Sequence, residues 1–461
     1  MPCTTILVGK KASADGAPLV SRNEDYFTAF NPKRFVVIKP ADQPVHYQSV
    51  HNKLKLELPT DPQRYTSLLE SDIKKDGYWG EAGINASNVS MSATETSTTN
   101  SRVLGVDPLN PKGIGEEDFV TIVLPYIHSA REGVERLGKL LEKYGTYESN
   151  GVAFGDANEI WYMETIGGHH WAAKRVPDDC YVAAPNWFSI TDFDFDSDDT
   201  MSSADLKQMI ADNHLNIDRE GYNLRHIFGS HNDSDYGYNI PRQWYIQHLF
   251  NPHDDLRPDD PEMPFAKQPE HLLTIEDVKY ALSSHYQHTK YDTYEGTEDG
   301  KHKFRPIGIQ RNQEVHVLEV RSDVDPAEAG IIWLAYGPNP YNGLAPFYTN
   351  VTDTPAPYRD SSKKFDINNM YWLTHTIATM GDDHNWRYNA SLEDLDRNTL
   401  AAGRHNIAET DAKFADAGDA AAQQKLLMDT NEKTAKKAHD LAMKCLGDMV
   451  KKGSLLMKLN Y

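Results

Sequence analysis

Short apolar runs bounded by glycine, proline and aspartate dominate the first 190 residues of the chain, a pattern typical of β-strands joined by turns. One helix interrupts them, because apolar residues recur at helical spacing between Ser129, a suitable N-cap, and Gly145, a helix stop. After this helix we expect a tight antiparallel meander. The predicted strands are 4–8, 19–23, 89–94, 119–124, 151–154, 159–165, 170–176 and 181–184.

The remainder of the chain is predicted to be mainly helical. Helices are expected near 203–213, 242–250 and 274–284, strands at 314–320 and 330–336, and helix throughout after Asp366. Apolar residues from Ala435 to Val450 form one stripe at helical spacing, which places Cys445 in the core. Two blocks of strands with helices before and after predict an α+β fold in which helices cover two antiparallel sheets.

The beginning of the chain carries the clearest candidate chemistry. Cys3 leads directly into a predicted strand, and Arg22 and Asp25 belong to the next one. A cysteine at a chain start can use its own α-amine, with a pKa of about 7.7–8.0, as the base for its thiol nucleophile. Arg22 would favour the thiolate, and Asp25 would hold the amine and thiol in place. The alternative is that Cys3 is a small buried apolar residue and that Arg22 and Asp25 form a surface salt bridge.

Several motifs, in order, resemble the dipeptidase A family of N-terminal-nucleophile cysteine peptidases, which is distantly related to penicillin V acylase and bile salt hydrolase. The resemblance covers the chain to about residue 360 and implies the αββα sandwich of N-terminal-nucleophile hydrolases. We expect residues 1–390 to form the catalytic domain and residues 391–461 a helical C-terminal extension packed on the same body. The motifs are Cys3-Thr-Thr-Ile-Leu-Val-Gly, Ser21-Arg-Asn-Glu-Asp, Gly83-Ile-Asn-Ala-Ser-Asn, Glu159-Ile-Trp-Tyr-Met-Glu-Thr, Gly167-Gly-His-His-Trp, Ala184-Pro-Asn and Trp333-Leu-Ala-Tyr-Gly.

The resemblance also implies roles for single residues. The Arg-x-x-Asp arrangement of the related acylases falls on Arg22 and Asp25, their oxyanion-holding asparagine on Asn186, and a second arginine on Arg242. Glu95 stands near the position of another asparagine or a tyrosine in the acylases. A carboxylate there could bind the free ammonium group of a dipeptide, while an arginine binds its carboxylate. For Asn186, Arg242 and Glu95 the alternative is that they are ordinary turn, helix and surface residues.

Maturation is the remaining requirement of this mechanism. The sequence begins Met1-Pro2-Cys3, and Pro2 would cap the amine that must act as base. We therefore expect both residues to be removed, Pro2 by the protein itself or by a helper.

Composition narrows the partners and the compartment. The formal net charge of −21 argues against nucleic acid and anionic membrane surfaces as partners. The first residues lack a secretory signal, and no apolar run approaches the ~20 residues of a membrane span. Three widely spaced cysteines fit neither a disulfide framework nor a zinc site. The expectation is a cytoplasmic protein without a cofactor, acting on dipeptides, with homo-oligomerisation possible.

Three other functions compete with a broad-specificity cysteine dipeptidase acting through an acyl-enzyme. A two-zinc dipeptidase would use His231-Asn-Asp233 and Glu116-Glu117, but that class has the two motifs in the opposite order. His169 and His170 are also weak metal ligands, because adjacent residues of a strand point to opposite faces and cannot readily bind one ion. The same N-terminal machinery could instead cleave non-peptide amides, as an acylase. A non-enzymatic protein could line a ligand pocket with tryptophans, namely Trp79, Trp161 and Trp187.

Overall fold

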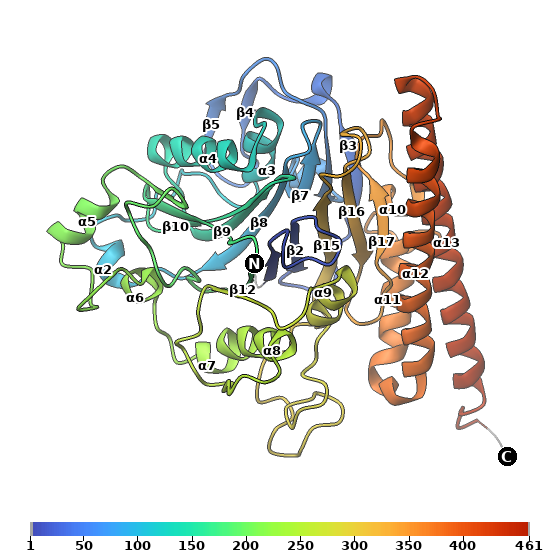
Figure 1. Ribbon diagram of the computed structural model, residues 1–461. Coiled ribbons are helices and arrows are strands. Elements are labelled where there is room, and N and C mark those ends of the chain that lie inside the picture. The colour runs from blue at the N-terminus through green and yellow to red at the C-terminus, as the bar shows by residue number, and fades with distance from the viewer. Residues whose placement is uncertain (1–2, 460–461) are drawn as a thin grey trace.

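Two antiparallel sheets face each other at the centre of the molecule, and helices lie outside them (Figure 1). The computed structural model describes residues 3–459. The first sheet has seven strands in the order β14-β12-β1-β2-β15-β16-β17. In that order their bounds are Ala266–Lys267, Tyr181–Ala184, Thr4–Val8, Leu19–Asp25, Asn312–Val320, Gly330–Tyr336 and Ala345–Tyr348.

The second sheet has eight strands in the order β13-β11-β10-β9-β8-β7-β6-β3. In that order their bounds are Thr200–Ser202, Trp171–Arg175, Ile160–Thr165, Ser149–Gly155, Ser90–Ser97, Gly80–Asn85, Tyr65–Glu70 and Lys33–Ile38. A separate hairpin pairs β4 (His46–Gln48) with β5 (Lys55–Glu57).

Helices cover the outer faces and one edge of the sandwich. Helices α3 (Phe119–Val123) and α4 (Ala130–Tyr144) pack on the eight-stranded sheet, whereas α8 (Ile240–Phe250) and α9 (Ile275–Leu282) pack on the seven-stranded one. Helices α11 (Met370–Gly381), α12 (Asn385–Phe414) and α13 (Ala420–Ser454) stand beside β16 and β17. Helices α12 and α13 are the two long helices coloured orange to red in Figure 1. The short helices are α1 (Ile73–Asp76), α2 (Ser101–Leu104), α5 (Leu206–Asp212), α6 (Leu224–Phe228), α7 (Asp235–Tyr238), α10 (Ala356–Arg359), η1 (Pro40–Asp42), η2 (Leu124–Tyr126) and η3 (Asp382–His384).

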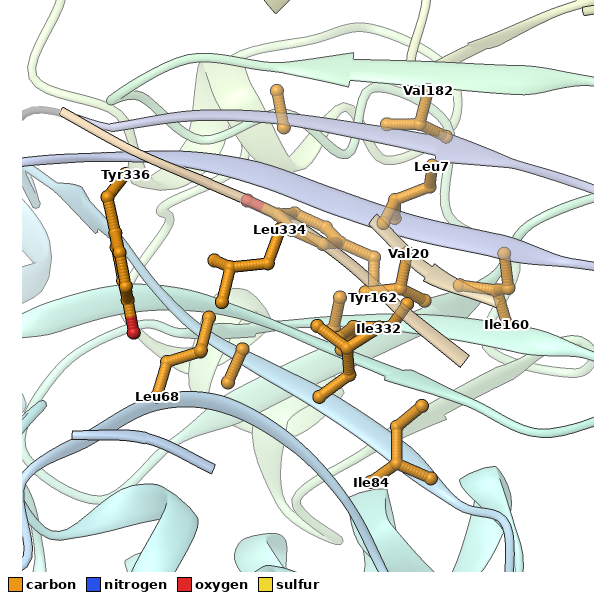
Figure 2. Close-up of a cluster of buried hydrophobic side chains, with 14 of the residues drawn as sticks. Leu7, Val20, Leu68, Ile84, Ile160, Tyr162, Val182, Ile332, Leu334 and Tyr336 are labelled. Carbon is orange, nitrogen blue, oxygen red and sulfur yellow. The ribbon is translucent and has the colours of Figure 1, made fainter. Parts of the chain in front are cut away.

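The strand pleat divides the apolar residues between separate cores. Leu7 and Val20 point into the space between the sheets, where Ile84 and Ile332 meet them (Figure 2). Ile6, next to Leu7 in β1, belongs instead to the core under α8 and α9, because successive side chains of a strand point to opposite faces. A third core lies between the eight-stranded sheet and α3 and α4. The fold is therefore the expected α+β, αββα sandwich.

Most predicted elements are present, with small differences at their ends. The predicted helix is α4, capped by the Ser129 side chain, which accepts from the backbone N–H of Glu132, and ended at Gly145, which has φ +71. Cys445 is buried, as its place in the apolar stripe predicted, but Val450 at the end of that stripe is exposed. No helix among the described residues is long and apolar enough to span a bilayer.

The prediction of a strand at 119–124 is wrong. These residues form α3 and the start of η2, and every residue from Phe119 to Val123 is buried. A short, mostly apolar run such as this one has the same pattern in a buried strand and in a buried helix, so its pattern alone does not decide between them. The pattern also missed strands β3, β6, β7 and β17. Charged residues stand at one end of β3 and of β6, glycines and a glutamate interrupt β7, and β17 has only four residues, one of them a proline.

Candidate active site

Cys3 lies immediately before β1, on the side of the seven-stranded sheet that faces the other sheet. It is fully buried and packs against Trp79. The register of β1 and β2 places Thr5 opposite Arg22, so the side chains at positions 3, 5 and 22 share this face. The guanidinium of Arg22 donates from Nη1 to the Cys3 Sγ over 3.1 Å. The sheet register therefore creates the pairing of thiol and cation.

Arg22 is held rigidly by acceptors of the facing sheet. Its Nε donates to the Ser92 hydroxyl at 3.0 Å, and Nη2 donates to the carbonyls of Glu81 and Ala93, each at 2.8 Å. Nη2 also contacts the Glu81 carboxylate at 3.1 Å, and Nη1 donates to the Thr94 carbonyl at 3.2 Å. Burial alone would lower the pKa of Arg22, but the charges of Cys3 and Glu81 raise it. The group beside the thiol is a fixed cation.

The thiol itself is in an apolar setting. Burial raises the pKa of the Cys3 thiol well above its ordinary value, Arg22 opposes this rise, and the Glu95 carboxylate adds to it. In the described chain the neutral thiol is favoured, since one cation does not offset the loss of water around a thiolate. Forming the nucleophile therefore requires a second group that removes the proton.

Arg242 contacts the backbone of Cys3 and also holds Asn186. Arg242, on α8, donates to the backbone carbonyl of Cys3 and, at 2.8 Å, to the Thr4 hydroxyl. Its other terminal nitrogen donates to the Asn186 Oδ1 at 2.8 Å. Burial lowers the pKa of Arg242 to about 10, so it remains charged at neutral pH. Asn186, two residues after the end of β12, and helix α8 are thus tied to the start of β1.

Glu95 connects this group to β8. Its Oε1 accepts from the Thr5 hydroxyl at 2.7 Å, and its Oε2 accepts from the Asn186 Nδ2 at 3.2 Å. Burial raises the pKa of Glu95 to about 8, although Arg22 opposes the rise. Both oxygens of this carboxyl are engaged with the protein, and near neutral pH much of it is protonated.

Asp25 ends β2 and is buried. Its carboxylate accepts from the Asn312 amide and forms an ion pair with Arg305. Burial raises the pKa of Asp25, and the charges of Arg305 and Arg242 oppose that rise. Both guanidinium groups lie over the ring of Tyr238, at 5.1 and 4.8 Å from its centroid. Arg305 and Asn312 were missed from the sequence because they lie about 280 residues from Asp25 and only the fold brings them together.

A second charged cluster lies behind Arg22 and was also missed. The Lys33 Nζ is 3.0 Å from Glu81, 2.5 Å from Glu70 and 3.3 Å from Glu24, and all four side chains are buried. Glu81 bridges this lysine and Arg22. The sequence did contain a signal for this cluster, namely a lysine and glutamates within strand segments. Charged side chains that are buried in strands require partners of opposite charge, so they could have been expected to meet.

Hydrogen bonds link five of the six predicted residues around the start of β1, namely Cys3, Arg22, Arg242, Asn186 and Glu95, and a cavity opens beside them. Asp25 instead bonds to Arg305 and Asn312. Asn186 and Trp187 line this cavity, whose volume is about 840 Å³. The other two tryptophans of the ligand-pocket interpretation lie elsewhere, because Trp79 packs on Cys3 and Trp161 is in the core under α4. Within residues 3–459, no three or more His, Cys, Asp or Glu side chains are grouped to hold a metal ion.

The chain is similar to several known proteins. Residues 2–398 match the model of peptidase family C69. The chain is 52% identical over 466 residues to a probable dipeptidase B of Lactococcus lactis subsp. lactis (strain IL1403), covering 100% of this chain and 97% of the relative. It is 50% identical over 470 residues to dipeptidase A of Lactobacillus helveticus, covering 100% and 98%. Among solved structures, the chain matches a mutant conjugated bile acid hydrolase from Clostridium perfringens at 12% sequence identity. The match covers 76% of this chain and 92% of the hydrolase, with a TM-score of 0.36.

Proposed function

Because this chain belongs to peptidase family C69, we propose that it is a cysteine dipeptidase of broad specificity whose nucleophile is the Cys3 thiol. One observation supports this choice of nucleophile above all. The Arg22 guanidinium donates to the Cys3 Sγ over 3.1 Å inside a fully buried group of partners. A buried arginine has no structural need for a thiol acceptor, whereas a cation beside Sγ stabilises a thiolate.

The reaction proceeds in two halves. The α-amine of Cys3 takes the thiol proton, and Sγ attacks the carbonyl carbon of the peptide bond, whose oxygen becomes an oxyanion. The C–N bond then breaks, and the α-ammonium gives its proton to the leaving nitrogen, which leaves a thioester. Water, deprotonated by the same amine, attacks the thioester and expels the thiolate. The C-terminal amino acid leaves when the C–N bond breaks, and hydrolysis of the thioester releases the N-terminal one. The α-ammonium then returns its proton to Sγ, which regenerates the enzyme.

The surrounding residues take the remaining roles. Arg22 stabilises the thiolate, and Asn186, positioned by Arg242, donates to the oxyanion. Such a donor typically contributes about 2.7–4 kcal/mol of barrier lowering. Asp25, fixed by Arg305 and Asn312, orients the amine of Cys3. Glu95 remains a candidate for substrate binding, although it would have to release Thr5 or Asn186 to do so.

The mechanism requires a chain that begins at Cys3. Met1 and Pro2 lie outside the described residues, and the proposal is that whatever precedes Cys3 is removed before the enzyme is active. Intact-mass measurement of active protein tests this requirement. Full activity in molecules that retain Pro2 would exclude the α-amine as the base.

The domain division, compartment and assembly are also proposals. The family match, which ends at residue 398, supports a catalytic domain of residues 1–390 with a helical extension of residues 391–461. Helix α12 runs through this boundary, so the two parts share one body. All three cysteines are unpaired, which suits the cytoplasm. Light scattering of the purified protein would show whether it forms a homo-oligomer.

The test of function is a dipeptide assay of the Cys3→Ala variant beside the wild type, with Cys180→Ala as the matched control. We expect the first variant to lose turnover and the second to retain it, because Cys180 is half-buried and lies beside Gly9, at the end of β1 away from Cys3. Wild-type activity should survive a chelator and be lost to a thiol alkylator. Dipeptide hydrolysis by the Cys3→Ala variant would overturn the proposal, and cleavage of acyl amides but not dipeptides would favour the acylase function.

A further inference from the structure

A buried series of hydrogen bonds joins Arg22 to a carboxylate on β15. The Nε of Arg22 donates to the Ser92 hydroxyl at 3.0 Å, and the Oγ of that hydroxyl is 2.9 Å from Nε2 of His316. The other ring nitrogen of His316, Nδ1, is 2.8 Å from Oε1 and 3.1 Å from Oε2 of Glu314. His316 and Glu314 are fully buried, and Ser92 is 3% exposed. The series therefore lies in the interior of the protein.

The register of the strands brings these side chains together. His316 lies directly opposite Arg22 where β15 pairs with β2, and Glu314 is two residues earlier on β15. Residues two apart in a strand share a face, so both side chains stand on the face of Arg22. Ser92 belongs to β8 of the facing sheet. Its hydroxyl therefore bridges the two sheets, with Arg22 and His316 both reaching it from the seven-stranded one.

The direction of each bond follows from the donors that are available. A guanidinium can only donate, so the Ser92 oxygen accepts from Arg22 and its own proton is left for His316. Nε2 of His316 then accepts, which requires a neutral ring with its proton on Nδ1, where it donates to Glu314. A proton on both ring nitrogens would place two donors on the Ser92 oxygen and a second cation opposite Arg22. The bonds therefore all run from Arg22 towards Glu314.

This series determines how the guanidinium of Arg22 is turned. Nε lies in the guanidinium plane, so the bond to Ser92 helps to decide where Nη1 points, and Nη1 donates to the Cys3 Sγ at 3.1 Å. Burial lowers the pKa of Arg22, but the charges of Cys3, Glu81 and Glu314 raise it. The carboxylate at the end of the series thus also favours the charged guanidinium.

Stability alone does not account for a histidine and a glutamate at this place. Leu7 and Val20 show that apolar side chains fill the space between the sheets. A buried charged pair contributes little to stability compared with apolar residues of similar volume, because removing it from water is costly. The role of the pair is therefore to be sought in the group to which it is connected, the guanidinium beside the nucleophile.

We propose that Ser92, His316 and Glu314 are positioning residues, which hold Arg22 in the orientation that brings Nη1 to the Cys3 Sγ. Glu314 fixes the ring of His316, and His316 takes the hydroxyl proton of Ser92, so that the Ser92 oxygen is turned towards Nε. All three residues act through Arg22 and exchange no proton with the substrate. The inference rests on the proposed function, in which Arg22 stabilises the Cys3 thiolate.

The test compares two substitutions of His316 in a dipeptide assay. In His316→Gln the amide can supply both bonds, since its oxygen can accept from Ser92 and its nitrogen can donate to Glu314, whereas the side chain of His316→Leu supplies neither. We expect His316→Leu to lower kcat on alanyl-alanine about 10–100-fold with little change in KM, and His316→Gln to stay within about threefold of the wild type. His375→Leu is the matched control, because His375 is also buried and hydrogen-bonded, but on α11. Its kcat should not change.

Alkylation of Cys3 against pH is the second readout, because a purely structural role of His316 would not move it. We expect the apparent pKa of the Cys3 thiol to be higher in folded His316→Leu than in the wild type, and to be unchanged in His316→Gln. The rate at Cys180 serves as the internal control. Should His316→Leu fail to fold, Ser92→Ala removes a single oxygen atom and should shift both readouts in the same direction.

Other outcomes separate this inference from the proposed function. Wild-type kcat and a wild-type alkylation profile in His316→Leu would overturn the positioning role, and so would equal losses in His316→Gln and His316→Leu. Either result would leave the dipeptidase function intact. Absence of dipeptide hydrolysis in the wild type would instead refute the function, whereas the alkylation profiles, which need no substrate, would still test whether these residues act on Cys3 through Arg22.

Discussion

The reactivity of Cys3 depends on the balance between burial and one cation. Burial raises the pKa of its thiol, and the Arg22 guanidinium is the largest effect in the other direction. Because Arg22 is fixed by acceptors on the facing sheet, it cannot move away from Sγ without leaving those acceptors unsatisfied. The thiolate, once formed, therefore meets a preorganised charge rather than a mobile one.

Replacing that cation should shift the acid limb of the pH profile. In Arg22→Gln we expect the Cys3 pKa to rise further and kcat/KM on dipeptides to fall at least about 100-fold, since roughly 2.7 kcal/mol of thiolate stabilisation is lost. The measurement is kcat/KM against pH, together with alkylation of Cys3 followed by mass spectrometry. Alkylation of Cys180, whose pKa burial raises to about 11, serves as the internal control. An unchanged pH profile would show that Arg22 does not set the charge state of the thiol.

At this scale the sequence predicted the neighbours that lie close in the chain. Cys3 precedes β1 and Arg22 belongs to β2, so the pairing of these two strands and one turn are enough to bring the thiol and the guanidinium together. Asp25, three residues beyond Arg22, points to the other face of β2, where it bonds to Arg305 and Asn312. Glu81, Arg305 and Asn312 come from strands and loops whose order in the sheets had to be known first. Their chemistry was visible in the sequence, whereas their partners were not.

The packing of α4 illustrates how single residues set the position of an element. Gly133 and Gly138 face the sheet, where an added Cβ would lie 2.4 Å from the ring of Phe154 and 2.4 Å from the ring of Trp171. The helix therefore approaches the aromatic side chains of β9 and β11 more closely than any larger residue would allow. The sequence predicted α4 correctly from its stripe and caps, but the need for these glycines appears only when the sheet is in place. The sequence pattern likewise does not show which surface α3 packs against, and this is why α3 was mistaken for a strand.

Two glycine-to-alanine changes should have opposite effects on stability. In Gly133→Ala the gain in helix propensity, about 1 kcal/mol, is outweighed by overpacking against Phe154, and we expect a net loss of about 1–2 kcal/mol. In Gly447→Ala, on α13, nothing lies within 4 Å of the added Cβ, so the free energy of unfolding should rise by about 0.5–1 kcal/mol. Urea denaturation of both variants and of the wild type measures these changes in the free energy of unfolding. Equal effects in the two helices would contradict the close approach of α4 to the sheet.

Over the whole molecule, buried carboxyl groups accompany a formal net charge of −21. Burial raises the pKa of several of them: to about 8 for Glu95, and to about 7 for Glu70, Asp118, Glu148 and Glu164. In the unfolded chain the same groups titrate near 4. Between these values the folded protein therefore holds more protons than the unfolded one.

The sign of the pH dependence follows from this difference. Stability rises with pH where the unfolded state binds more protons, and here the folded state binds more, so the free energy of unfolding should fall as pH rises from about 5 to 8. Each such group contributes at most about 1.4 kcal/mol per pH unit. His170, whose pKa is raised by Asp107 against the opposing effect of burial, has the same sign, since its charge is lost over the same range. Carboxylates with lowered pKa values, such as Asp107 at about 2, act only at lower pH.

We therefore expect this protein to be more stable at pH 5.5 than at pH 8.0, by at least about 2 kcal/mol in urea denaturation at constant ionic strength. Glu164→Gln removes one fully buried titrating group and should flatten the slope, whereas Glu135→Gln, exposed on α4, should leave it unchanged. Because the repulsion among 68 acidic residues also grows with pH, the experiment is repeated at high salt, which screens the surface charges but not the buried ones. A slope that disappears in salt would assign the effect to the surface, and a stability that rises with pH would show that these carboxyls are ionised in the folded state.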